Sequence, residues 1–195
     1  YGELKQHGDF GIGTFNGLDG EMIGLDGMFY QVKADGVAYA VADSMKTPFA
    51  AVTFFEADKE VALDQSVDYE QLRHFLDQML PTQNIFYAIK IEGTFTYIKT
   101  RSVPGQHKPY PPLVEVVKHQ PTFEFHDVTG TMVGFRCPAY VKGVNVPGYH
   151  LHFITEDKKG GGHVLDCRIQ DVTIGIDYTS GFYLTLPEAG AFYET

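Results

Sequence analysis

Four Asn-Gly or Asp-Gly pairs divide the start of the chain into short segments: Asn16-Gly17, Asp19-Gly20, Asp26-Gly27 and Asp35-Gly36. Such pairs supply the positive φ angles of tight hairpin turns, and the segments between them are rich in apolar residues. This spacing predicts an antiparallel β-meander with strands at residues 11–15, 21–25 and 28–33. Residues 51–55 are expected to continue the same sheet.

One helix is predicted in the first half of the chain. Asp68-Tyr-Glu-Gln71 has the form of a capping box, in which the first and last side chains satisfy backbone N–H groups at a helix start. Apolar residues then recur on one face as far as Leu80, and Pro81 follows. Residues 85–91 and 94–101 are typical of two further strands, separated by a glycine-containing turn.

A proline-rich segment interrupts the chain. Residues 104–112 contain four prolines and a glycine, which neither a helix nor a central strand tolerates. We therefore place a boundary near residue 108. Residues 1–108 are expected to form a mixed β-sheet lobe with one helix, and residues 109–195 a β-barrel-like lobe. The expected fold class is α/β in the broad sense, a strand-rich α+β protein. Short strands are predicted in the second lobe at 124–125, 130–135, 148–153, 163–169, 172–177 and 182–186.

Charge and composition exclude some classes of function. The 195 residues carry a net charge of −10, so nucleic acid phosphates would be repelled. There is no run of eighteen apolar residues to form a membrane-spanning helix, and the first residues do not read as a signal peptide. We expect a cytoplasmic protein, with secretion as the open alternative. Cys137 and Cys167 are expected to be buried thiols.

Three histidines fall within fourteen residues, at His150, His152 and His163. Side chains alternate between the two faces of a strand, so His150 and His152 point the same way while Leu151 and Phe153 face an apolar layer. The glycine-rich segment 155–162 is typical of a hairpin loop that returns the third histidine beside the pair. Three neutral imidazoles that leave one coordination position open are typical of a catalytic Zn²⁺ site. The alternative is a set of ordinary, partly buried polar side chains.

A catalytic metal needs a companion acid or base, and two glutamates are candidates. Glu21 directly follows a tight turn and could point back over a neighbouring site. Glu156 lies four residues after His152 with the same strand parity, so it could bind the same metal. For each glutamate the alternative is a solvated surface charge, and the spacing alone does not exclude it.

Two further residues could contact a substrate. Arg101 ends a predicted strand, and a guanidinium there could hold a carboxylate through two parallel hydrogen bonds. Thr14 lies in a glycine-rich strand and could donate its hydroxyl in a close approach. A surface charge and an ordinary strand threonine are the respective alternatives.

Four segments occur in a specific order along the chain: Asp9-Phe-Gly-Ile-Gly-Thr-Phe-Asn-Gly-Leu-Asp-Gly-Glu21, Asn84-Ile-Phe-Tyr-Ala-Ile-Lys-Ile-Glu-Gly93, Gly130-Thr-Met-Val-Gly-Phe135 and Gly148-Tyr-His-Leu-His-Phe153. With shorter matches between them, they resemble the bacterial α-acetolactate decarboxylases over nearly the whole chain. The resemblance implies a carboxy-lyase of acetoin biosynthesis, usually a homodimer. Its substrate would be 2-acetolactate, a 2-hydroxy-3-keto acid, converted to (R)-acetoin and CO₂ through an enediolate stabilised by bound Zn²⁺.

The resemblance also assigns residues. The family's metal histidines fall on His150, His152 and His163, its glutamate on Glu21, its arginine on Arg101 and its active-site threonine on Thr14. It therefore favours Glu21 over Glu156. The family further implies a C-terminal glutamate that reaches the metal centre, for which neither Glu188 nor Glu194 is a secure counterpart.

Two alternatives stay open at this stage. His150-x-His152-x-x-x-Glu156 also resembles the first metal motif of cupins, which would imply an iron or manganese dioxygenase or isomerase. The second cupin motif is not present, because His163 stands where a cupin would show glycine and no Gly-x-x-His segment follows it. The other alternative is a non-catalytic metal-binding or sugar-binding β module, for which the glycine-rich hairpins and acidic surface would suffice.

Overall fold

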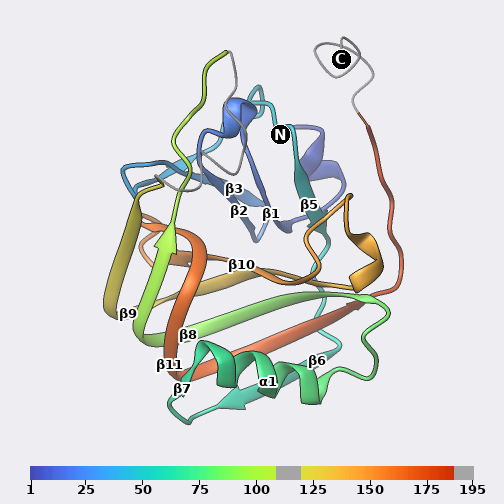
Figure 1. The fold of residues 1–195 in the computed structure, drawn as a ribbon, viewed down its shortest axis with the longest axis vertical. Coiled ribbons are helices and arrows are strands. Elements are labelled where there is room, and N and C mark those ends of the chain that lie inside the picture. Colours follow the sequence, from blue (N-terminus) through green and yellow to red (C-terminus); the bar gives the residue numbers. More distant parts are fainter. Residues whose placement is uncertain (109–119, 187–195) are drawn as a thin grey trace.

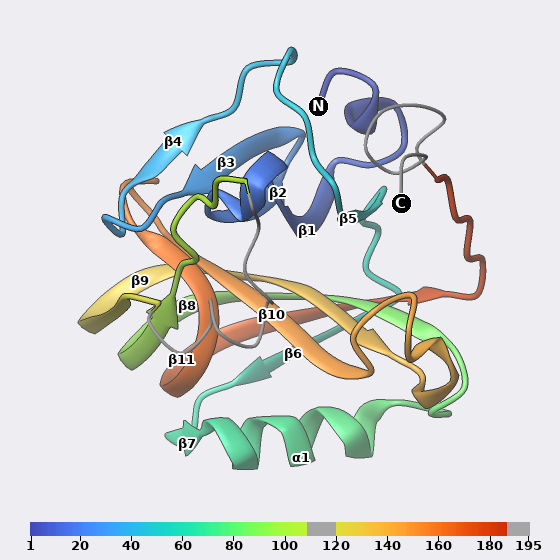
Figure 2. The same cartoon turned by 45° about the horizontal axis from the view of Figure 1, so that its top comes forward.

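The computed structural model describes residues 1–108 and 120–186. The chain forms three layers: a five-stranded sheet, a larger sheet beneath it, and one α-helix under the far face of the larger sheet (Figures 1 and 2). This is the strand-rich α+β arrangement that the sequence predicts.

The first layer is the predicted meander, with strand order β4-β3-β2-β1-β5 and every pair antiparallel. Its strands are β1 (Phe10–Thr14), β2 (Glu21–Leu25), β3 (Met28–Val32), β4 (Ala38–Ala40) and β5 (Ala50–Thr53). Short 3₁₀ turns occupy Leu4–Gln6 (η1) and Asn16–Leu18 (η2). The glycines of the four turn pairs all have positive φ, as predicted, with values of 74°, 92°, 75° and 79°.

The second sheet has the order β10-β9-β8-β11-β6, and β10 also pairs with β11, so its strands close on themselves at one end. A 3₁₀ turn, η4 (Ala139–Val141), precedes β10. The strands are β6 (Lys59–Leu63), β7 (Val67–Asp68), β8 (Phe86–Arg101), β9 (Thr122–Cys137), β10 (Gly148–Thr155) and β11 (Gly161–Thr179).

The prediction of short strands in this sheet is wrong in three places. Residues 86–101, 124–135 and 163–177 lie in the continuous strands β8, β9 and β11, respectively. The expected turn at Gly93 is instead a bend within β8: Gly93 has φ 146° and pairs with Gly130. A Cβ at Gly93 would overlap the carbonyl oxygen of Asp171 in β11, so the glycine permits close packing rather than chain reversal.

The expected strand at 182–186 is also absent, since residues 180–186 carry no helix or strand. The side chains there are exposed, with Tyr183 at 96%. They alternate in polarity, but no neighbouring strand pairs with them, and an unpaired segment of this length is not a strand.

Helix α1 (Tyr69–Met79) begins with the predicted capping box. The backbone N–H of Gln71 donates to Asp68 Oδ1 at 2.9 Å, and the backbone N–H of Asp68 donates to Gln71 Oε1 at 3.0 Å. Leu72 and Leu76 are fully buried and belong to the apolar core between α1 and the second sheet. The helix therefore covers the sheet face that points away from the first layer (Figure 2).

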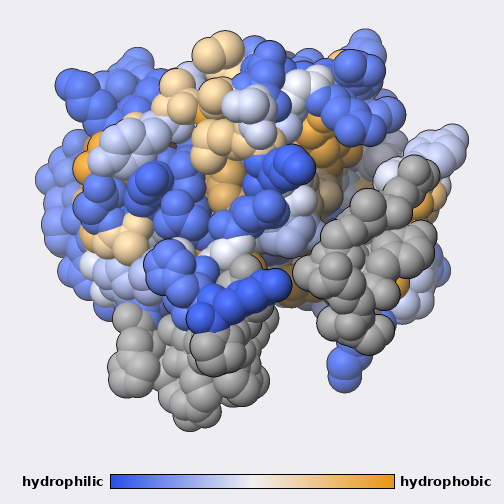
Figure 3. Space-filling model, turned by 90° about the horizontal axis from the view of Figure 1, so that it is seen from above, coloured by the Kyte–Doolittle hydropathy of each residue, from blue (hydrophilic) through white to orange (hydrophobic). Residues whose placement is uncertain are grey.

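A second core lies between the two sheets and contains Phe10, Ile12, Ile23 and Leu25 from the first layer. A third, smaller cluster packs on the outer face of the first layer. Figure 3 views the molecule from that side and shows apolar side chains at its centre with hydrophilic ones around them. The inter-sheet core matters most for function, because the candidate site lies in the same layer.

The lobe boundary near residue 108 stays a prediction, and the sheets do not follow it. Strands β6 and β8 precede residue 108, yet they pair with β11 and β9, which follow it. Cys137 and Cys167 are free, buried thiols, as expected. Within residues 1–108 and 120–186, no helix is long and apolar enough to cross a membrane.

Candidate metal centre

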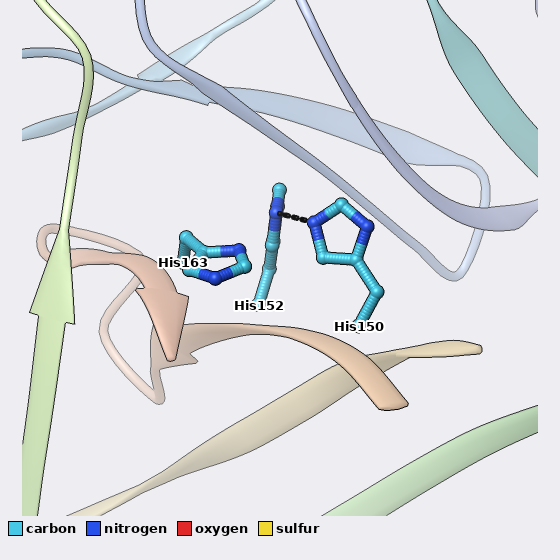
Figure 4. Close-up of side chains that lie close together, drawn as sticks. All are labelled: His150, His152 and His163. Atoms are coloured by element: carbon cyan, nitrogen blue, oxygen red, sulfur yellow. Dashed lines mark hydrogen bonds between the residues drawn. The ribbon is translucent and has the colours of Figure 1, made fainter. Parts of the chain in front are cut away.

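The three predicted histidines converge between the two sheets (Figure 4). His150 and His152 come from β10, and His163 lies near the start of β11, where it pairs directly with His152. One potential ligand atom from each ring lies within 4.8 Å of the others. The strand alternation is as predicted, because Leu151 and Phe153 belong to the core on the helix side.

The proton on His152 can be placed from its neighbours. Its Nδ1 lies 2.7 Å from the backbone carbonyl oxygen of Met22 in β2. A carbonyl only accepts hydrogen bonds, so Nδ1 carries the proton and Nε2 keeps its lone pair. That Nε2 lies 3.2 Å from Nε2 of His150. A backbone carbonyl that fixes the tautomer in this way is the usual support of a metal-binding histidine.

Burial keeps all three imidazoles neutral at pH 7. It lowers the pKa of His150 to about 4 and that of His163 to about 2, with Arg101 adding to the effect. Burial also holds the pKa of His152 well below its ordinary value. Neutral imidazole is the form that binds a metal ion. Within the described residues, Nδ1 of His150 and of His163 is buried without a hydrogen-bond partner, so neither of these two nitrogen atoms is engaged by another group there. The donor set therefore fits a divalent metal.

Glu21 faces the histidines from the opposite sheet. It is the first residue of β2, shares a face with Ile23 and Leu25 of the inter-sheet core, and is only 7% exposed. Its Oε2 lies 3.5 Å from Nε2 of His152. Burial raises the pKa of Glu21 to about 7, partly opposed by the positive charge of Arg101.

Thr14 supports the backbone that leads into Glu21. The two residues are cross-strand partners in β1 and β2, and Thr14 Oγ1 donates to the carbonyl oxygen of Gly20 at 2.8 Å. The buried Gln31 side chain donates to the backbone carbonyl of Asp19 in the same turn. Sequence reasoning missed Gln31, whose only signal is a polar residue among the apolar residues of a predicted strand.

Arg101 ends β8 and pairs with His163, which in turn pairs with His152. Arg101, His163 and His152 thus form one row across β8, β11 and β10, and cross-strand partners project from the same face. Nη1 of Arg101 donates to Gln120 Oε1 at 2.7 Å and lies 3.4 Å from Glu21 Oε1. Sequence reasoning assigned no contact to Gln120.

The comparisons with known proteins identify the family. Residues 1–195 match the family described as alpha-acetolactate decarboxylase. The chain belongs to the α-acetolactate decarboxylase family. The resemblance seen in the sequence is thereby confirmed, and with it the class of carboxy-lyases. The cupin and binding-module alternatives are not favoured.

Relatives in this family cover nearly the whole chain. The α-acetolactate decarboxylase of Methanosarcina mazei is 56% identical over 192 residues, which are 98% of this chain and 67% of the relative. That of Methylococcus capsulatus is 51% identical and is matched over 100% of this chain and 75% of its own length. The crystal structure of the Bacillus subtilis strain 168 enzyme superposes with a TM-score of 0.95 at 47% identity, covering 98% of this chain and 82% of that one.

The structure separates Glu21 and Glu156, the two glutamates that residue spacing alone left open. Glu156 lies in the exposed turn after β10 and is not part of the group of potential metal ligands found among the described residues. Glu21 contacts both His152 and Arg101. Glu188 and Glu194 lie outside the described residues.

Proposed function

We propose that this chain decarboxylates 2-acetolactate to (R)-acetoin and CO₂, with a Zn²⁺ ion held by His150, His152 and His163. Family membership supports the reaction, and the convergence of three neutral imidazoles supports the metal. The observation that carries the proposal is the meeting of these imidazoles with a buried carboxyl and a guanidinium in one layer.

A Zn²⁺ ion held by His150, His152 and His163 would supply Lewis-acid chemistry, which would lower the cost of the negative charge that develops on the substrate when CO₂ departs. The side chain of Arg101 binds the substrate carboxylate and orients the C–C bond that breaks. The electron pair of that bond moves toward the former ketone carbon and its oxygen.

Glu21 then supplies the proton that completes acetoin. In the metal-free protein burial raises the pKa of this carboxyl to about 7, so it holds a proton more readily than an exposed glutamate does, which suits a proton donor. The carboxyl approaches from the first sheet only, so it delivers the proton to one face of the enediolate and fixes the (R) configuration. Thr14, the third proposed active-site residue, holds the backbone that positions this carboxyl.

The test is acetoin formation from racemic 2-acetolactate before chelation, after chelation and after restoration of zinc. Zinc-dependent acetoin supports the proposal. One bound zinc per chain without any acetoin would overturn it and favour a non-catalytic metal-binding protein. Unchanged activity in a Glu21→Ala variant would exclude Glu21 as the proton donor but would leave the proposed reaction and metal site intact.

We also propose that the chain acts as a homodimer, as the family resemblance implies. Light scattering during gel filtration should give twice the 21.8 kDa mass of one chain. A mass of one chain at micromolar concentration would contradict this.

A further inference from the structure

The guanidinium of Arg101 has a neutral partner that is closer than its charged one. Nη1 lies 2.7 Å from the amide oxygen of Gln120, but 3.4 Å from the carboxylate oxygen of Glu21. The first distance is that of a good hydrogen bond and the second is long for one. The amide of Gln120 therefore sets the direction of this end of the guanidinium.

Gln120 is held in place by its neighbours in the chain. The backbone N–H of Ser102 donates to the carbonyl oxygen of Pro121 at 3.2 Å, and Thr122 pairs with Arg101 across β8 and β9. The Ser102 hydroxyl donates at 2.7 Å to Val32 O in the first sheet. Arg101 thus ends β8 and Gln120 lies just before the start of β9, the strand that pairs with β8, which fixes the spacing between their side chains.

A neutral acceptor has a different consequence from a charged one. A carboxylate at 2.7 Å would form a charge-assisted bond and offset the positive charge of the guanidinium. An amide oxygen orients the same N–H group without offsetting the charge. The positive charge then remains available for an anionic ligand that approaches the other nitrogens.

We propose that Gln120 is a positioning residue that determines specificity: its neutral amide orients Arg101 while leaving the guanidinium charge free for the substrate carboxylate. This inference rests on the proposed function. It predicts that Gln120 favours the anionic substrate over the neutral product, because acetoin keeps the ketone and hydroxyl oxygens of 2-acetolactate but lacks its carboxylate.

The experiment that tests the role of Gln120 compares two constants in the zinc-loaded protein: KM for 2-acetolactate and the inhibition constant for acetoin. Gln120→Glu keeps the side-chain shape and adds a charge, and we expect it to raise KM roughly tenfold while the acetoin constant stays within about twofold. Gln120→Leu removes the acceptor without adding charge, and we expect a rise in KM of roughly threefold, smaller because the guanidinium keeps its charge.

The control is Gln106→Glu. Gln106 lies on the same segment after β8, and its side chain donates to the carbonyl oxygen of Pro104 rather than contacting Arg101. The Gln106→Glu variant adds the same negative charge on the same connecting segment. A general effect of negative charge on the ratio of KM to the acetoin inhibition constant would therefore appear in this variant too. We expect its ratio of KM to the acetoin constant to match the wild type.

The ratio of KM to the acetoin inhibition constant in these variants decides whether Gln120 has the proposed role. A ratio that rises in Gln120→Glu, rises less in Gln120→Leu and is unchanged in the control supports the inference. An unchanged ratio in an active Gln120→Glu variant, an equal rise of both constants, or an equal effect in the control overturns it and leaves the proposed function intact. If Gln120→Glu does not fold by circular dichroism, an unchanged ratio in Gln120→Leu overturns it. A wild-type chain that makes no acetoin overturns the proposed function and this inference together.

Discussion

Replacing Glu21 by Gln should make the metal-free protein more stable at neutral and alkaline pH. The same replacement should abolish acetoin formation by the zinc-loaded protein. Glu21 is 7% exposed, and burial raises its pKa from 4.5 to about 7. The folded protein must therefore keep a charge in an apolar layer once the pH exceeds that value. Gln has nearly the same shape and carries no charge, so the variant avoids this penalty.

The sign and size follow from proton linkage. Between pH 4.5 and 7 the folded state holds a proton on Glu21 that the unfolded state has released, so the stability from this group is complete below pH 4.5 and is lost as the pH rises through 7. The shift corresponds to about 3 kcal/mol at pH 8. The gap in unfolding free energy between Glu21→Gln and the wild type should widen by about this amount from pH 4.5 to pH 8.

The assay is urea unfolding in the presence of a chelator, repeated across this pH range for both proteins. Comparing the change with pH, rather than one absolute value, removes effects of shape that do not depend on charge. The control is Glu92→Gln, which removes a carboxylate that is 46% exposed and 2.9 Å from Lys90. Exposed ion pairs contribute little to stability, so its gap from the wild type should stay small at every pH.

A constant gap between Glu21→Gln and the wild type would refute the reasoning, because it would mean that Glu21 is not held in a poorly solvated layer. A gap that widens with falling pH would have the wrong sign and would show instead that the charged form is stabilised. Adding zinc should reduce the gap, because a cation beside His152 favours the carboxylate form of Glu21.

Three further changes test the fold and the site. Asp68→Ala should lower the unfolding free energy by about 1 kcal/mol in urea, because it removes the helix cap. Gly93→Ala should lower the unfolding free energy by more than ~2 kcal/mol, because Asp171 O occupies the space that the new Cβ needs. Gly143 also has a positive φ but has open space at its Cβ position, so Gly143→Ala should lower it by only about 1 kcal/mol. Equal losses in the two variants would contradict the close-packing account. His163→Gln should weaken zinc binding at least about 100-fold in a competition assay with a chelator, and one tightly bound zinc per chain would remove His163 from the ligand set.

Features that depend on neighbouring residues could be predicted from the sequence. The turn glycines, the capping box at Asp68 and the shared face of His150 and His152 all follow from local rules of backbone geometry. The long strands could not be predicted in the same way. A glycine such as Gly93 is compatible with a chain reversal or with a bend inside a strand. Only its pairing with the distant Gly130 decides between the two.

The site was predictable to the same limited extent. The spacing of residues brought the three histidines together, but it left both Glu21 and Glu156 as open candidates. Burial separates them, and burial depends on how the first sheet packs over the second. The family resemblance of the sequence favoured Glu21 independently of that packing. The contact between Arg101 and Gln120 had no local signal, because it joins the ends of two strands that become neighbours only in the folded sheet.

The row formed by Arg101, His163 and His152 also has a consequence for how the protein folds. Its members come from three strands, and the fourth group, Glu21, comes from the other sheet. Contacts between residues so far apart in the chain form slowly, because long loops must close first. Refolding should therefore restore zinc affinity first, because all three metal ligands lie on the consecutive strands β10 and β11, and the contacts of Arg101 and Glu21 last. Colorimetric zinc uptake should then precede the recovery of acetoin formation, and the delay between the two would record the docking of the first sheet over the second.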